Sequence, residues 1–318
     1  MKTNLWEEIK LEYKNIGLLD DFRSINGFNK RLGTWSPITN DSRYYKSLLF
    51  EFCNYLDLKI SNTIINSKET NYSPIQKGDG LRYYFGKIKN TNFGNPTTIK
   101  YYGIEVDMDY LLSVEEIFFL KDVLADSKSI LEIGAGFGRL THSIIKCFPN
   151  INKYYIVDLD WMLKLSSKYL KKVLSKKDFK KVEFIKSEDY MSLNKIDLTI
   201  NIDSFQEIDE SVIMKYLGFI SNNSQFFYSK NAICKYDPSI INLSVKNKKQ
   251  YNSALKMGLC KNSINIFDTS ELEIAKINYL RMYCPTEFEI LKHQDCFGQY
   301  LYYQSVLYGK SKKNEKTF

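Results

Sequence analysis

The chain has 318 residues, enough for one large domain or for a main domain with an appendage. Its 45 basic and 37 acidic residues give a net charge of +8, but the lysines are scattered, so nucleic-acid binding is not expected. The six cysteines are widely spaced and include no CxxC pair, which excludes a zinc finger or a small disulfide framework. No apolar stretch approaches the roughly 20 residues of a membrane helix and no signal core is present, so we expect a soluble, cytoplasmic protein.

Residues 1–109 are expected to form a mixed, largely helical N-terminal cap. Leu5 to Ile16 and Arg43 to Leu56 have helical periodicity, and the tract between them is rich in Gly, Asn, Ser and Pro. The aromatic segment Gly78 to Gly86 is interpreted as a short strand. Its aromatic residues suit either an acceptor-binding lid or packing against the main domain, and we expect a mixture of both.

From residue 110 onward, strands and helices alternate, which indicates a parallel sheet covered on both faces. Strands are expected at Ser129–Ile133, Lys153–Val157, Lys181–Lys186, Ile196–Ile202 and Gln225–Tyr228. Helices are expected at Leu111–Leu124, Arg139–Phe148, Trp161–Leu174 and Glu210–Ile220. An insert at about residues 232–282 precedes two closing strands, Glu287–Leu291 and Gln299–Tyr308, which would form a terminal hairpin.

The first of these strands runs into a glycine-rich turn, Gly134-Ala135-Gly136-Phe137-Gly138. Glycine lets the backbone bend sharply and lie close to a ligand. The dinucleotide-binding fingerprint requires Gly or Ala where this chain has Arg139, and Glu132 would repel a pyrophosphate. Glu132 suits a ligand with a cationic amino-acid end, and the turn looks like the nucleoside-binding turn of class I S-adenosylmethionine (SAM) methyltransferases.

Acids also end the next two strands, and ligands of open α/β sheets bind at such carboxyl ends. Asp158, followed by Leu159, is expected to accept hydrogen bonds from both ribose hydroxyls, with Asp160 as the competing carboxylate. Either Glu188 or Asp189 is expected to reach the adenine amino group.

The methionine end would be held by Glu132 together with the backbone N–H groups of Gly134, Ala135 and Gly136. Each acid taken alone is equally well explained as a helix N-cap or a first-turn carboxylate. Their occurrence together, at successive strand ends behind a glycine turn, favours a ligand site.

The end of the fourth strand, Asn201 to Ile208, is the second informative stretch. Asp203 and Glu207 share a face if a helix begins here, and a carboxylate can take the proton of a hydroxyl as its oxygen is methylated. Two alternatives stay open: a carboxylate pair that holds a divalent ion, and a capped helix with Asp203 or Ser204 at the N-cap. No metal is predicted. His293, just after the sixth strand, is a further candidate base.

Three stretches, Leu131–Gly138, Tyr155–Leu159 with Tyr169-Leu170, and Asn201–Glu207, together resemble the bacterial sugar O-methyltransferases of surface-polysaccharide gene clusters. The likeness covers about Leu81 to Gly309. It implies SAM as cofactor and a nucleotide-activated or glycan-linked sugar as acceptor. It supports Glu132, Asp158 and the stretch from Asp203 to Glu207 as site positions.

We therefore expect an α/β fold with a Rossmann-like class I methyltransferase sheet in residues 110–318, seven-stranded with its last strand antiparallel, behind the N-terminal cap. The leading hypothesis is direct methyl transfer from SAM to a sugar hydroxyl of a surface-polysaccharide precursor. The alternatives are another small cytoplasmic acceptor, a nucleic acid, or a SAM-binding scaffold without activity. A homo-oligomer is compatible with the sequence.

Overall fold

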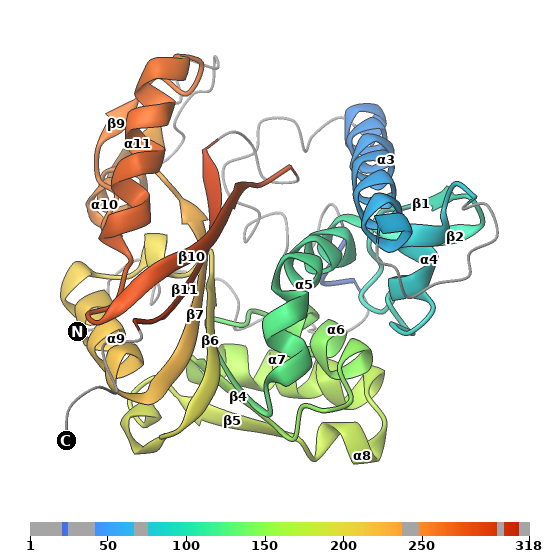
Figure 1. The fold of residues 1–318 in the computed structure, drawn as a ribbon, viewed down its shortest axis with the longest axis horizontal. Coiled ribbons are helices and arrows are strands. Elements are labelled where there is room, and N and C mark those ends of the chain that lie inside the picture. The colour runs from blue at the N-terminus through green and yellow to red at the C-terminus, as the bar shows by residue number, and fades with distance from the viewer. Residues whose placement is uncertain (1–20, 25–41, 67–75, 237–247, 298–301, 312–318) are drawn as a thin grey trace.

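A seven-stranded sheet lies at the centre of the computed structural model, which describes residues 21–24, 42–66, 76–236, 248–297 and 302–311 (Figure 1). The strand order is β10-β11-β7-β6-β3-β4-β5. The last strand, β11, runs antiparallel to both of its neighbours, and the other pairs are parallel. This order and these directions confirm the predicted α/β fold with a Rossmann-like class I methyltransferase sheet. The strands are β3 (Ser129–Ile133), β4 (Lys153–Asp158), β5 (Val182–Lys186), β6 (Ile196–Ile202), β7 (Ser224–Ala232), β10 (Phe288–Asp295) and β11 (Tyr303–Lys310).

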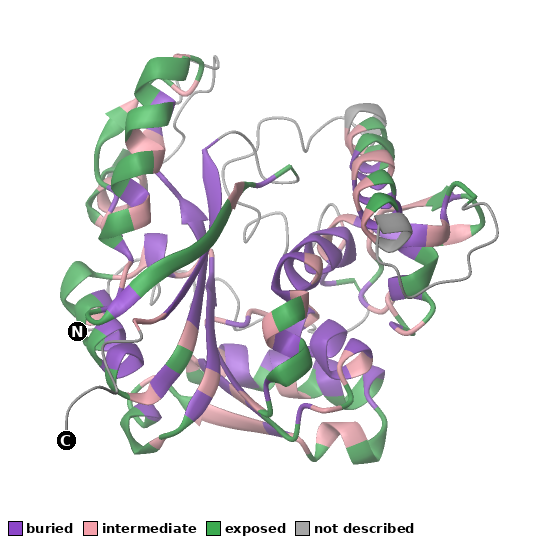
Figure 2. Cartoon of the chain, viewed as in Figure 1, coloured by how far each residue is buried: buried purple, intermediate pink, exposed green. Residues whose placement is uncertain are grey.

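Helices cover both faces of the sheet. Successive residues of a strand point to opposite faces, and in β3 Ile130 packs into the core with α5, α6 and α7, whereas Leu131 and Ile133 pack with α9 and α11. The central strands are accordingly buried along most of their length (Figure 2), as parallel strands require. These helices are α5 (Met108–Asp126), α6 (Arg139–Cys147), α7 (Asp160–Val173), α9 (Glu210–Asn223) and α11 (Thr269–Met282).

Two groups of smaller elements lie on opposite sides of the molecule (Figure 1). The N-terminal group packs against α5 and comprises α3 (Ser42–Asn66), α4 (Asp79–Phe85), β1 (Thr98–Tyr101) and β2 (Ile104–Asp107). The group from the insert accompanies α11 and comprises β8 (Lys235–Tyr236), α10 (Lys248–Lys256) and β9 (Ser263–Ile264). The remaining short elements are α8 (Lys176–Phe179), η2 (Tyr190–Ser192) and η3 (Phe205–Glu207).

The helix predicted at Arg43–Leu56 is confirmed and extends to Asn66, whereas the one predicted at Leu5–Ile16 lies outside the described residues. Across the described ranges, no helix is both long and apolar enough to cross a membrane.

The strand predicted at Gly78–Gly86 is wrong, because this segment forms the helix α4. Gly78 adopts a left-handed φ of 96°, and the Asp57 side chain on α3 accepts hydrogen bonds from the N–H groups of Gly78 (2.6 Å) and Leu81 (3.1 Å). Gly80 packs so closely that a Cβ there would lie 2.7 Å from the Asp57 carbonyl oxygen. A tertiary contact with α3 therefore overrides the strand preference of the aromatic residues.

Two strands extend further at their carboxyl ends than predicted. β7 continues through Ser229, Lys230 and Asn231 to Ala232, and all three polar residues are buried. β10 extends to Asp295, so that His293 lies within the strand rather than after it.

Candidate functional site

The glycine turn after β3 forms an open cradle. Gly134, Gly136 and Gly138 have φ values of 77°, 58° and 94°, a region that side chains other than glycine rarely adopt. The Gly134 N–H donates to the Val157 carbonyl of β4 at 2.9 Å, which fixes the start of the turn to the sheet. A Cβ atom on Gly136 would meet no atom within 4 Å, so the middle of the turn faces open space.

Asp158, at the end of β4, lies beside this cradle. Its half-buried carboxylate accepts hydrogen bonds from the Gly136 N–H (3.3 Å) and the Leu159 N–H (2.8 Å). Burial raises the pKa of Asp158 to about 7. The competing carboxylate, Asp160, is exposed at the start of α7 and lies 3.7 Å from the Lys186 ammonium. Of the two acids, Asp158 is the one that contacts the turn.

Glu132 supports the turn from within the core. Its Oε2 atom accepts hydrogen bonds from the hydroxyls of Thr141 on α6 and Tyr154 on β4, both at 2.7 Å. Burial raises the pKa of this carboxyl group. Glu132 thus ties the helix that follows the turn to the neighbouring strand. Sequence reasoning missed both hydroxyl partners, because neither belongs to the glycine motif.

The loop after β5 reaches the same edge of the sheet. Its Ser187 N–H donates to the Asp158 carbonyl at 3.1 Å. The following acids, Glu188 and Asp189, are both exposed, and Glu188 accepts a hydrogen bond from the Ser187 hydroxyl at 3.2 Å. The structure therefore brings the ends of β3, β4 and β5 together, with two exposed acids after β5.

Residues near the N-terminus also contact the turn, which sequence reasoning did not foresee. The Phe22 ring packs edge-on against Phe137 of the turn, with ring centroids 5.4 Å apart. Its neighbour Arg23 is buried, forms ion pairs with Asp107 and Asp109, and lies 5.3 Å from the Phe137 ring centroid. Because these partners are about 85 positions or more away in the chain, no local sequence pattern signals the contact.

The end of β6 is hydrogen-bonded to the strand that enters the turn. The Asn201 side-chain amide and the Ser204 hydroxyl both donate to the Ile133 carbonyl, at 3.0 Å and 3.1 Å. Asn201 also donates to the Ser204 hydroxyl. The acidic loop that begins at Asp203 is thereby held directly against the glycine turn.

Asp203 and Glu207 belong to this loop and do not begin an α-helix. Asp203 has a left-handed φ of 62°, and the short 3-10 helix η3 that follows has no side-chain cap. The next α-helix, α9, is capped by Asp209, which accepts from the Ser211 N–H. The capped-helix alternative holds only in part: Ser204 stands at the N-cap position of η3 with Glu207 in its first turn, but its side chain caps no backbone N–H.

The environment of Glu207 favours proton uptake near neutral pH. Burial and the charge of Asp203 raise the pKa of Glu207 to about 7, against an opposing effect of Lys235. Lys235, from the insert, donates to the Gln206 carbonyl at 3.1 Å, and burial lowers its own pKa. Sequence reasoning did not identify Lys235. In the part of the chain that the structure describes, no three acidic, His or Cys side chains are grouped to hold a metal ion.

His293 lies apart from these acids. It is exposed on β10 and pairs in register with Val306 of β11, which pairs with Ser229 of β7. Three inter-strand spacings, about 14 Å in total, therefore separate its strand from β6. Its Nδ1 atom lies 3.4 Å from the Gln304 side-chain amide nitrogen.

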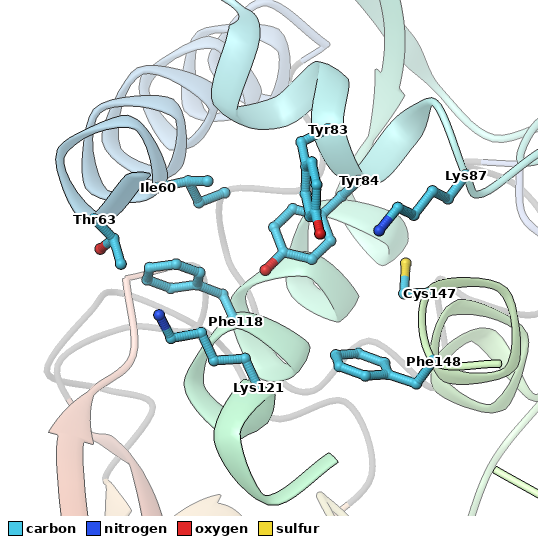
Figure 3. Close-up of a pocket in the computed structure, with 9 residues that line it drawn as sticks. All are labelled: Ile60, Thr63, Tyr83, Tyr84, Lys87, Phe118, Lys121, Cys147 and Phe148. Carbon is cyan, nitrogen blue, oxygen red and sulfur yellow. The ribbon is translucent and has the colours of Figure 1, made fainter. Parts of the chain in front are cut away.

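A separate hollow of about 210 Å³ lies among α3, α4, α5 and the end of α6 (Figure 3). Two of its lysines rest on aromatic rings: Lys87 lies 4.0 Å from the Tyr83 ring centroid and Lys121 lies 5.3 Å from that of Phe118. It adjoins the C-terminal end of α6, whereas the glycine turn precedes the N-terminal end. None of the predicted site residues lines it.

The sequence matches no protein-family model, and no curated protein was found to be similar. Similar solved structures include the methyltransferase domain of bacterial CtHen1, with 12% identity, a TM-score of 0.45 and coverage of 64% of this chain and 99% of that one. The mitomycin 7-O-methyltransferase MmcR has 10% identity and a TM-score of 0.40, over 63% of this chain and 57% of that one. A SAM-dependent methyltransferase from Clostridium acetobutylicum has 16% identity and a TM-score of 0.40, over 64% of this chain and 92% of that one. Membership in the sugar O-methyltransferase family stays a prediction.

Proposed function

We propose that this protein is a SAM-dependent methyltransferase that methylates a hydroxyl oxygen. The observation that carries the proposal is the direct contact between the glycine turn and the acidic loop after β6, at the carboxyl edge of the sheet. Ligands of such sheets bind at this edge. A cradle for the methyl donor and a group able to accept a proton would thus be neighbours.

The residues at the turn fit SAM. The open side of Gly136 leaves room for a ligand against the backbone, and Asp158 offers carboxylate oxygens there for the ribose hydroxyls. The N–H groups of Gly134 and Gly136, which were expected to hold the methionine carboxylate, already donate to Val157 and Asp158, so the N-terminal N–H groups of α6 would take this role. Glu132 would favour the ammonium through its charge, and Glu188 or Asp189 would accept from the adenine amino group. When bound, SAM supplies a methyl group activated by a sulfonium.

On the acceptor side, Glu207 would take the hydroxyl proton. A general base works best with a pKa near the operating pH, and burial together with Asp203 raises the pKa of Glu207 to about 7. Asp203 would act mainly by setting this pKa. His293 is the alternative base, although it lies on β10, the outermost strand of the sheet.

We assign the acceptor to the sugar of a surface-polysaccharide precursor, carried by a nucleotide or a glycan. The support for this class is the resemblance of the Asn201–Glu207 stretch to the sugar O-methyltransferases. Another small cytoplasmic molecule is the alternative acceptor, and the experiment below separates the two.

The test is incubation with SAM and a panel of uridine-, guanosine- and thymidine-diphosphate hexoses, followed by mass spectrometry. We expect S-adenosylhomocysteine and a sugar product heavier by one methylene unit, both lost with Glu207→Gln. Tight SAM binding without turnover of any sugar would refute the sugar assignment. Absence of SAM binding would refute the methyltransferase assignment itself.

A further inference from the structure

Four charged side chains form a buried chain of ion pairs beside the proposed SAM cradle. Arg139, the first residue after the glycine turn, makes a bidentate pair with Glu116 of α5, at 2.6 Å and 2.9 Å. The Lys230 ammonium of β7 lies 3.1 Å from Glu116 and 3.2 Å from Glu115. Lys230 and Glu116 are fully buried, and Glu115 accepts the Phe297 N–H at 2.9 Å with its other oxygen.

The chain of ion pairs is charge-balanced, and buried ion pairs of this kind are weak evidence for a stability role. Two cations face two carboxylates, and burial of such groups costs much of what their attraction returns. Burial alone would raise the pKa of Glu116, but Arg139 and Lys230 lower it, so the carboxylate stays ionised. In other proteins, replacing such pairs by apolar residues of the same volume is often neutral or stabilising. A positional role explains the arrangement better than a stability role.

The geometry connects two parts of the proposed site. One oxygen of Glu116, Oε1, accepts from both Arg139 (2.9 Å) and Lys230 (3.1 Å), so it joins the start of α6 to β7. The backbone carbonyl of Lys230 accepts the Asp203 N–H at 2.9 Å. Lys230 therefore anchors Glu116 with its side chain and holds the acidic loop with its main chain.

We propose that Glu116 and Lys230 are positioning residues, which hold Arg139 and with it the glycine turn in the geometry that binds SAM. The inference rests on the proposed function, since it assigns the turn to SAM. Neither residue would touch the ligand. Lys230 would act on Arg139 through Glu116, because both side chains donate to the same oxygen, Oε1.

The test compares SAM affinities, measured by calorimetry, in two charge-balanced double variants. Glu116→Gln with Lys230→Met removes the carboxylate that pairs with Arg139 and leaves it only the Ser113 hydroxyl, so we expect the Kd for SAM to rise at least tenfold. Glu115→Gln with Lys230→Met leaves the Arg139–Glu116 pair but removes its anchor on β7, and we expect a rise of about threefold. Lys230→Arg keeps the charge and should restore a Kd within about twofold of wild type.

A matched control separates position from stability. Leu124→Ala creates a cavity on the same helix, away from the network, and should lower the melting temperature without changing the Kd. If the Glu116→Gln/Lys230→Met variant binds SAM like the wild type, the positioning role is refuted. If both double variants fail to fold while Leu124→Ala folds, the network is a stability element and the proposal is equally refuted. Failure of the wild type to bind SAM would instead refute the proposed function.

Discussion

Gly134 and Ser204 touch: a Cβ atom on Gly134 would lie 2.4 Å from the Ser204 Oγ atom. Gly134 opens the glycine turn after β3, and Ser204 belongs to the acidic loop after β6. A side chain on Gly134 would overlap Ser204, so the two loops lie closely against each other at this point. This contact places the loop that carries the proposed base against the proposed donor cradle.

Gly134→Ala is predicted to damage both stability and SAM binding. The new methyl group would collide with Ser204, and the φ of 77° is strained for alanine. We expect a loss of about 1–3 kcal/mol in the free energy of unfolding and a weaker SAM affinity. Urea denaturation and calorimetry measure the two effects.

Gly218→Ala is the matched control for this change. Gly218 lies in α9, has a helical φ, and a Cβ there would meet no atom within 4 Å. Alanine is the better helix residue, so we expect a gain of roughly 0.5–1 kcal/mol. If the free energy of unfolding of Gly134→Ala equalled that of Gly218→Ala, the close contact between Gly134 and Ser204 would be contradicted.

Asp158 is predicted to make SAM binding pH-dependent. Burial raises the pKa of its carboxyl group to about 7, so the group is protonated below that pH and ionised above it. Because the ionised form would accept hydrogen bonds from both ribose hydroxyls in the proposed site, SAM affinity should rise as the pH increases through about 7. Asp158→Asn should weaken binding and flatten this profile, as measured by calorimetry between pH 5.5 and 8.5.

The control for Asp158 is Asp160→Asn. Asp160 is exposed and lies beside Lys186, away from the turn. Its substitution should leave the SAM affinity within about twofold at every pH, since exposed ion pairs contribute little. A larger loss for Asp160→Asn than for Asp158→Asn would exchange the roles of the two carboxylates.

Glu207 is predicted to control the pH profile of turnover. Below its pKa of about 7 the carboxyl group is protonated and cannot accept a proton, so kcat/KM for the acceptor should rise with pH through that value. Asp203→Asn removes the charge that helps to raise this pKa and should shift the rise to lower pH. Lys235→Met removes the opposing charge and should shift it to higher pH. An identical profile in all three proteins would remove Glu207 as the base.

Substitution of each candidate base separates Glu207 from His293. Loss of a general base costs roughly 100- to 10,000-fold in rate, so Glu207→Gln should lower kcat by at least about 100-fold with little change in SAM affinity. His293→Gln should leave kcat within about twofold, because His293 is exposed on the outer strand. The reverse result would assign the base to His293.

The strands that carry the site could be predicted from the sequence because they are short apolar runs bounded by polar residues. The predicted bounds of β3 and β6 agree with the structure. β7 was predicted too short because Ser229, Lys230 and Asn231 are polar. They continue the strand because distant groups satisfy them: Lys230 meets Glu115 and Glu116, 115 and 114 positions away in the chain.

Distant contacts also decide which parts of the site could be predicted. Asp158 follows a strand and a glycine turn at a recognisable spacing, so its position beside the turn could be predicted from the sequence. Lys235 reaches Gln206 across 29 positions, and the Phe22 ring packs on Phe137 from another part of the chain. Contacts of this kind follow from tertiary packing, which a single sequence does not display.

The most direct test of the central claim is calorimetric titration of SAM into the wild type and into Asp158→Ala at pH 8, with Asp160→Ala as control. We expect one SAM molecule bound per chain, an affinity at least tenfold weaker in Asp158→Ala, and an unchanged affinity in Asp160→Ala. No heat of binding with the wild type, or equal affinity in Asp158→Ala, would contradict the assignment of the glycine turn to SAM.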